Sequence, residues 1–181
     1  MSGPRVRPGT WRETGPVVAG FAALAGRVTG TEAPAVFRTL GRHRRLFWGW
    51  LHFAGRLMPG GRLARREAEL VILRVAALLG SEYELTQHRR LGRRAGLSAD
   101  EVAVAEREQD AATALSERER LALRAADELV ADQDVSDALW AELARVFDEK
   151  ERIELVMLVA HYAMLATVLK AFRVEPDQPR R

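Results

Sequence analysis

Residues 69–97 read ELVILRVAALLGSEYELTQHRRLGRRAGL, and apolar side chains recur in them at intervals of three and four. This spacing predicts two consecutive helices, at about 63–79 and 82–95, with a break near Gly80. The first helix is apolar almost all round, so we expect it to be central and buried. Gly96 ends the second helix, because glycine accepts the left-handed conformation at a helix C-terminus.

The same periodicity continues on both sides of this stretch, whereas the alternation typical of strands is hard to find. Three further helix starts carry capping boxes, in which a Ser or Asp and a glutamate three residues later cap each other: Ser98, Ser116 and Asp148. Further helices are predicted at about 35–57, 99–109, 117–131, 136–147 and 149–172. The sequence therefore predicts one all-α domain of seven or eight helices.

A short internal repeat indicates how these helices are organised. The segment ELVIL at 69–73 recurs as ELVML at 154–158, each time in a helix that follows a charged stretch. We interpret the repeat as two related helical halves that pack together.

Composition excludes several classes of function. The chain has 181 residues, 48% of them hydrophobic and 29% charged, which suits one soluble domain with a real core. The net charge is only +3, and the basic residues are not segregated, so we expect no nucleic-acid partner. There is no cysteine, which excludes disulfides, thiolate metal sites and thiol-based catalysis.

The N-terminus loosely imitates a signal peptide, because Arg5, Arg7 and Arg12 precede an apolar stretch at 15–26. Pro16 interrupts that stretch, and its helical spacing favours an amphipathic first helix instead. No apolar run reaches the length of a membrane span. We expect a cytoplasmic protein that does not bind membranes.

Glu84 and His88 are the candidate chemical pair, since side chains four apart on a helix share one face. A carboxylate beside an imidazole fixes its tautomer, and such a pair can take and return a proton near neutral pH. Glu69 reaches the same place if its helix packs antiparallel to the next one, and Arg74 is a possible partner for its buried charge. The alternative is structural: a solvated Glu/His pair, and a Glu69 at the favourable N-terminal end of its helix.

Other residues have weaker claims. Phe47, Trp50 and Phe53 share one face, which favours a core or a subunit interface over the wall of a ligand pocket. Tyr162 is either a core tyrosine or a donor to a ligand carbonyl. A helix-turn-helix reading of 91–108 fails, because the second helix would bring carboxylates to the phosphates. No second Glu/His pair completes a metal site.

The stretch 69–97 resembles the core motif of the carboxymuconolactone decarboxylase family, which also includes the alkylhydroperoxidase D-like proteins. The shared pattern is a glutamate before an apolar helix, a two-residue site twelve and fifteen positions later, a histidine four further on, and then a small residue with GLS. Here these positions are Glu69, Ser81, Glu84 and His88. The resemblance extends over about residues 35–176.

The resemblance implies an alkylhydroperoxidase D-like fold over residues 1–176, with the core motif at 63–110, a second half at 115–176 and a flexible tail at 177–181. It also implies a homo-oligomer, a trimer or hexamer. In the peroxidase branch of the family the two-residue site is Cys-x-x-Cys, so this chain lacks the thiols that a peroxidase cycle needs. The decarboxylase branch typically has a glutamate and a leucine before the histidine, as this chain does.

We therefore expect a cofactor-free lyase or proton-transfer enzyme that acts on a small unsaturated lactone or a carboxylated ring-cleavage product. His88 is the expected acid/base, Glu84 its partner, and Glu69 positions substrate or relays the proton. The expected substrate-binding residues are Ser81, Tyr83, Arg74, Trp50 and Tyr162. The alternative is a non-catalytic member that binds a ligand or only builds an oligomer.

Overall fold

The computed structural model describes residues 3–107, 115–178 and 180, and these contain α-helices and no β-strand. The helices are α1 (Trp11–Thr14), α2 (Pro16–Thr29), α3 (Ala35–Leu40), α4 (Arg44–Leu57), α5 (Arg65–Leu78), α6 (Glu82–Arg94), α7 (Ala99–Glu106), α8 (Glu117–Ala131), α9 (Asp137–Val146) and α10 (Glu149–Phe172). The predicted all-α fold is confirmed. The chain divides into unit 1, Met1–Ala54 with Thr167–Arg181, and unit 2, Gly55–Ala166.

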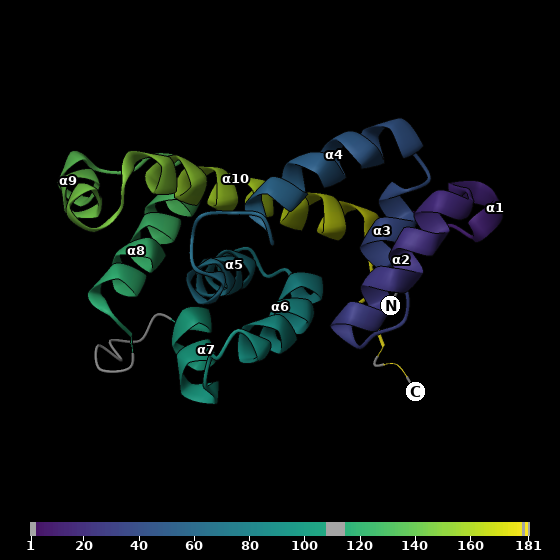
Figure 1. The fold of residues 1–181 in the computed structure, drawn as a ribbon, viewed down its shortest axis with the longest axis horizontal. Coiled ribbons are helices and arrows are strands. Elements are labelled where there is room, and N and C mark those ends of the chain that lie inside the picture. Colours follow the sequence, from purple (N-terminus) through teal and green to yellow (C-terminus); the bar gives the residue numbers. More distant parts are fainter. Residues whose placement is uncertain (1–2, 108–114, 179, 181) are drawn as a thin grey trace. The chain divides into compact units, whose positions relative to one another are not determined.

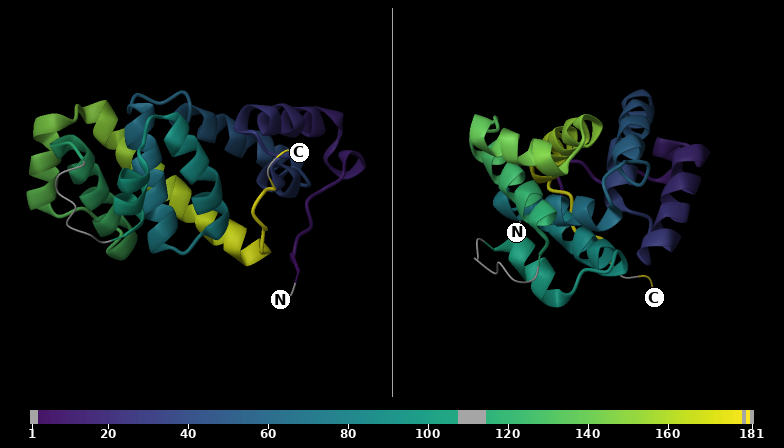
Figure 2. Two further views of the ribbon diagram at one scale, coloured as in Figure 1. Left: turned by 90° about the horizontal axis from the view of Figure 1, so that it is seen from below. Right: turned by 60° about the vertical axis from the view of Figure 1, so that its left-hand side comes forward.

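Helix α5 is the centre of unit 2, where α6, α7 and α8 all contact it (Figure 1). Every residue from Glu67 to Ala76 is buried, as its all-round apolar sequence predicts. Helix α9 packs on α8, and the two lie together in each view of Figure 2. The core between these helices is aliphatic and includes Leu70, Leu73, Leu85, Leu97, Val102 and Leu123.

The three predicted capping boxes are present. The backbone N–H of Ser98, Ser116 and Asp148 each donates to the side chain of the glutamate three residues later, at 2.7–2.8 Å. In return, the side chain of each cap accepts the backbone N–H of that glutamate. The helix starts of α7, α8 and α10 are therefore defined by local sequence.

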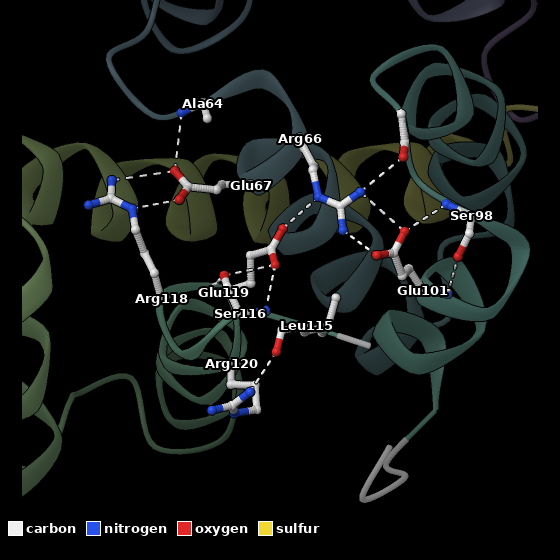
Figure 3. A network of polar contacts seen from close by, with 11 residues as sticks. Ala64, Arg66, Glu67, Ser98, Glu101, Leu115, Ser116, Arg118, Glu119 and Arg120 are labelled. Carbon is white, nitrogen blue, oxygen red and sulfur yellow. Dashed lines mark hydrogen bonds and ion pairs between the residues drawn. The ribbon is translucent and has the colours of Figure 1, made fainter. Parts of the chain in front are cut away.

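Two arginines join these helix starts to the start of α5 (Figure 3). Arg66 binds Glu101 on α7 and donates to Glu119 on α8 at 2.7 Å. Arg118 on α8 donates to Glu67 on α5 at 2.5 Å and to Glu151 on α10 at 2.8 Å. We call these six side chains the arginine network.

Unit 1 departs from the sequence prediction at one point. The helix expected over residues 35–57 is broken between α3 and α4, at residues 41–43. A Cβ at Gly41 would lie 2.5 Å from Val18 Cγ1, so the bare glycine backbone packs against α2 there. The aromatic cluster of this unit includes Phe47, which is fully buried, and Trp50, whose ring centre lies 6.1 Å from that of Phe47.

The C-terminal segment also differs from the flexible tail that the sequence predicts. Asp177 is buried, and its carboxylate accepts the backbone N–H of Ala35 at 2.7 Å, at the start of α3. The carbonyl of Gln178 accepts the backbone N–H of Glu32. Residues 179 and 181 lie outside the described residues.

Helix α10 is long and apolar enough to cross a membrane, judged by length and composition alone, so the prediction that no apolar run reaches that length is wrong. Its most apolar window has a mean hydropathy of 1.8, and 44% of that window is buried inside the protein. Core helices of soluble proteins meet the same criterion, so the expectation that the protein does not bind membranes stays a prediction.

Candidate functional site

Glu69 is the centre of the site, and its side chain has no exposed surface. It lies one turn into α5, where Arg65 stands four residues before it. Arg65 donates to Oε1 of Glu69 through Nε at 2.9 Å and approaches the same oxygen with Nη2 at 2.7 Å. Burying a carboxylate is costly unless it is paired, and this i,i+4 arginine supplies the pairing.

His88 on α6 contacts the other oxygen of Glu69, with Nδ1 2.7 Å from Oε2. Glu69 is ion-paired with an arginine, and an ionised carboxylate can only accept hydrogen bonds, so Nδ1 of His88 is the donor. This arrangement fixes the tautomer and leaves Nε2 as the ring nitrogen that can exchange a proton. The expected pairing of His88 with Glu84 is thus wrong: the packing of α6 on α5 gives the histidine Glu69 instead.

Glu84 is buried at 2% exposure, and neither carboxylate oxygen has a hydrogen-bond partner among the described residues. Burial raises the pKa of Glu84 to about 7. The Ser81 hydroxyl and the charge of His88 oppose this rise, although Ser81 does not reach hydrogen-bonding geometry. Near neutral pH this carboxyl therefore exists in both its protonated and its ionised form.

Ser81 precedes the first turn of α6 and is 1% exposed. Its hydroxyl has no hydrogen-bond partner among the described residues. A buried hydroxyl and a buried carboxyl, three residues apart and both without partners, are unusual in a protein interior. Such a pair is typical of a place where a ligand or water supplies the missing hydrogen bonds.

Tyr162 on α10 covers the histidine. Its ring packs edge-on against His88, with the ring centres 5.2 Å apart and the planes at 88°. Burial raises the pKa of the Tyr162 hydroxyl, and the charges of Glu69 and Glu84 raise it further. Tyr162 is therefore a neutral hydrogen-bonding group, and its neighbours are the two glutamates and His88.

His161 precedes Tyr162 and packs against it, with ring centres 5.2 Å apart. Burial lowers the pKa of His161 to about 4, because a charged imidazole is poorly solvated there. At neutral pH this ring is uncharged. Among the described residues, Arg65 is the positive group whose charge acts on the Tyr162 hydroxyl.

One of the expected substrate-binding residues within unit 2, Arg74, lies elsewhere. Arg74 is buried and forms an ion pair with Asp127 on α8, so it neither compensates Glu69 nor faces the site. Trp50 belongs to unit 1 and its aromatic cluster. Tyr83 is buried in the first turn of α6. Arg89 is also used structurally, because it makes two hydrogen bonds to Glu106, at 2.7 and 2.8 Å.

Arg65, which pairs with Glu69 inside the site, is not among the residues predicted from sequence. The i,i+4 spacing of Arg65 and Glu69 does indicate the pair, because side chains at this spacing meet on a helix. The glutamate of the internal repeat has a different role, because Glu154 accepts the backbone N–H groups of Arg62 and Leu63 at 2.7–3.0 Å.

Solved structures share this fold. An uncharacterized peroxidase-related protein from Silicibacter sp. TM1040 matches with a TM-score of 0.83 at 15% identity, over 97% of this chain and 94% of that one. The alkylhydroperoxidase AhpD core protein from Ralstonia eutropha JMP134 matches with a TM-score of 0.81 at 20% identity, over 97% and 93%. The debrominase Bmp8 matches with a TM-score of 0.80 at 18% identity, over 94% and 91%. The chain is thus an all-α protein of the alkylhydroperoxidase D-like fold.

The sequence profile of the carboxymuconolactone decarboxylase family matches residues 44–128, which include Glu69, Ser81, Glu84 and His88. The match covers this segment alone, and the chain has no cysteine. A comparison with curated protein sequences gives no significant match.

Proposed function

We propose that this chain is a cofactor-free proton-transfer enzyme, a lyase or a close relative of one, that acts on a small unsaturated lactone or a carboxylated ring-cleavage product. The observation that carries the proposal is an oriented histidine and an unpartnered, protonatable glutamate one turn apart on α6. His88 has its Nδ1 fixed by Glu69, and Glu84 has a pKa of about 7. Two titratable groups in different environments are what acid/base catalysis at neutral pH requires.

The chemistry follows from these positions. When an unsaturated lactone loses a carboxylate as carbon dioxide, the electron pair of the broken bond delocalises into the ring carbonyl as an enolate. Neutral hydrogen-bond donors such as Tyr162 and Ser81 stabilise the enolate oxygen. A carbon of the enolate then takes a proton from the acid form of Glu84, and His88 returns a proton to Glu84 from water.

Two further considerations favour a small ring compound as substrate. The chain has no cysteine, so the same positions cannot support a thiol peroxidase cycle. The structure of debrominase Bmp8 in complex with 2,3,4-tribromopyrrole has the same fold, with a TM-score of 0.77 at 18% identity, over 97% of this chain and 91% of that one. A protein of this fold can thus hold a small unsaturated ring.

The test follows the ultraviolet absorbance of 4-carboxymuconolactone mixed with wild-type protein and variants. We expect turnover by the wild type and a loss of about a hundredfold or more in His88→Ala and Glu84→Gln, the usual scale for a general acid or base. His52→Ala is the control, because His52 is exposed on α4 in unit 1. Undiminished turnover in His88→Ala contradicts the proposal. Binding of saturated lactones without turnover of any substrate favours the non-catalytic alternative.

A further inference from the structure

Arg65 links the buried site to solvent. Its side chain is 41% exposed, whereas the Glu69 side chain that it contacts is completely buried. Both contacts, from Nε and Nη2, go to a single carboxylate oxygen. The rest of the guanidinium, Nη1 and the second Nη2 hydrogen, has no hydrogen-bond partner among the described residues. Arg65 therefore retains donors that no described protein group uses.

Arg74 and Arg89 differ from Arg65 in their burial or in the carboxylates that they bind. Arg74 is 6% exposed and paired with Asp127. Arg89 has nearly the same side-chain exposure as Arg65, 40%, but it binds both oxygens of Glu106 and also lies 3.9 Å from Glu82. Arg65 differs from Arg89 in one respect that matters for recognition: its partner carboxylate belongs to the proton-transfer centre.

The guanidinium of Arg65 also acts on the centre electrostatically. Burial and the charges of Glu69 and Glu84 raise the pKa of Tyr162, and the positive charge of Arg65 opposes them. Arg65 is thus close enough to the Tyr162 hydroxyl for its charge to be felt there.

We infer that Arg65 determines substrate specificity by binding a carboxylate that the substrate retains, so that the site takes small ring carboxylic acids. The inference rests on the proposed function for the reacting end of the molecule. Arginine binds carboxylates through paired, charge-assisted hydrogen bonds, which gives it geometric as well as electrostatic selectivity. Arg65 is also the first residue of α5, and the helix N-terminus favours an anion on the same side.

This arrangement orients the substrate. The retained carboxylate binds to the exposed edge of Arg65, and the ring points inward to Ser81, Glu84 and His88. In the reverse orientation, the carboxylate of the substrate would lie in the same buried surroundings that disfavour the ionised form of Glu84. Arg65 is therefore a binding and positioning residue, while Glu84 and His88 perform the proton transfer.

Isothermal titration with two unreactive probes tests the inference: 5-oxotetrahydrofuran-2-carboxylate and the corresponding primary carboxamide, which has the same shape and no charge. We expect the wild type to bind the acid about tenfold more tightly than the amide, the scale of charge-assisted hydrogen bonds. Arg65→Gln should lose this preference, and Arg89→Gln, the matched control, should keep it. Equal affinities in the wild type, no acid binding, or an undiminished preference in Arg65→Gln overturns the inference.

Two measurements keep the result interpretable. Arg65→Lys retains a positive charge beside Glu69 but has no planar fork, so we expect a folded protein with a reduced preference for the acid. Glu84→Gln should bind the acid with the wild-type preference and show no turnover. If the wild type prefers the acid but turns over no substrate, the proposed reaction is wrong. If it turns over substrate but shows no preference for the acid, the proposed role of Arg65 is wrong. The failures of the two proposals are therefore distinguishable.

Discussion

Glu84 carries a free-energy cost that the proposed function would explain. A carboxyl that is 2% exposed and has no described hydrogen-bond partner is disfavoured in its ionised form. The rise of its pKa from 4.5 to about 7 corresponds to roughly 3 kcal/mol of folding free energy. The native state therefore binds this proton more tightly than the unfolded chain does.

The sign of the pH dependence follows. Below pH 4.5 both states are protonated and the protein has its full stability, which it loses as the pH rises through about 7. Glu84→Gln removes the ionisation, so we expect the variant to be more stable than the wild type by roughly 2–3 kcal/mol at pH 8 and little changed at pH 4.5. Denaturant unfolding at the two pH values measures this difference. Glu82→Gln, at an exposed neighbour on α6, should show neither effect.

Glu69 differs from Glu84 because each of its carboxylate oxygens has a hydrogen-bond partner, Arg65 for one and His88 for the other. We expect Glu69→Gln to destabilise the protein by roughly 2–4 kcal/mol, since the neutral amide leaves Arg65 without its counter-ion and gives His88 a poorer acceptor. The control is the repeated position, Glu154→Gln, where an amide oxygen can still accept backbone N–H groups. Thermal unfolding measures the stability that each variant loses. Equal losses of stability in the two variants would contradict the expected contribution of the Glu69 ion pair.

At the residue scale, the sequence could predict which residues lie near one another, but not which of them form hydrogen bonds or ion pairs with each other. Glu69, Glu84 and His88 share one neighbourhood, as expected, because each lies on the predicted face of a predicted helix. The partner of His88 depends on how α6 is rotated against α5, and spacing along a single helix does not determine that rotation. The same limitation explains why Arg74 pairs with Asp127 on α8.

Among the elements, the starts of α5, α7, α8 and α10 depend on one another through the arginine network, of which Figure 3 shows the contacts among α5, α7 and α8. Arg118 on α8 contacts two of the other helices, α5 and α10, and lies 3.9 Å from the ring centre of Phe147. We expect Arg118→Met to destabilise unit 2 by roughly 2–3 kcal/mol, because it leaves Glu67 buried without its counter-ion. The control is Arg124→Met, which removes a surface pair with Glu142 and should cost about 0–1 kcal/mol. Chemical denaturation measures both.

The network also predicts how the protein responds to acid. Arg66 and the backbone of Ser98 lower the pKa of Glu101 to about 2, and Arg118 lowers the pKa of Glu151. These depressed pKa values contribute stability above pH 4.5, and it is lost as the pH falls towards 2. The difference in melting temperature between wild type and Arg66→Met should therefore be large at pH 7 and shrink at pH 2. A constant difference would show that the arginine acts by packing alone.

Helix boundaries were predictable where side chains of the same segment define them. Ser98, Ser116 and Asp148 cap their helices as expected, since the capping box is local. The break at Gly41 depends on the close approach of α2, and the burial of Asp177 depends on the start of α3. Both are tertiary contacts, which no local pattern contains.

For the molecule as a whole, the outer face of α10 predicts self-association. Ile153, Met157 and Met164 are 57%, 42% and 46% exposed, and their intervals of four and seven residues match a helix seam that pairs with a second copy. We expect a homo-oligomer, a trimer or hexamer, in sedimentation velocity. Met157→Glu should shift it towards monomer, while Val17→Glu, at an exposed apolar position on α2, should not. A monomeric wild type that floats with lipid vesicles would instead assign this face to membranes.

The unpartnered pair Ser81 and Glu84 has a consequence for the chemistry that this fold can support. The same two positions hold thiols in the peroxidase branch that the sequence resembles, and those thiols exchange electrons through a disulfide. Here a buried hydroxyl and a buried carboxyl stand at the start of α6, and the nearby Glu69–His88 contact needs no thiol. With the proposed function, two side chains at the start of α6 separate the acid/base chemistry of this chain from the thiol chemistry of that branch.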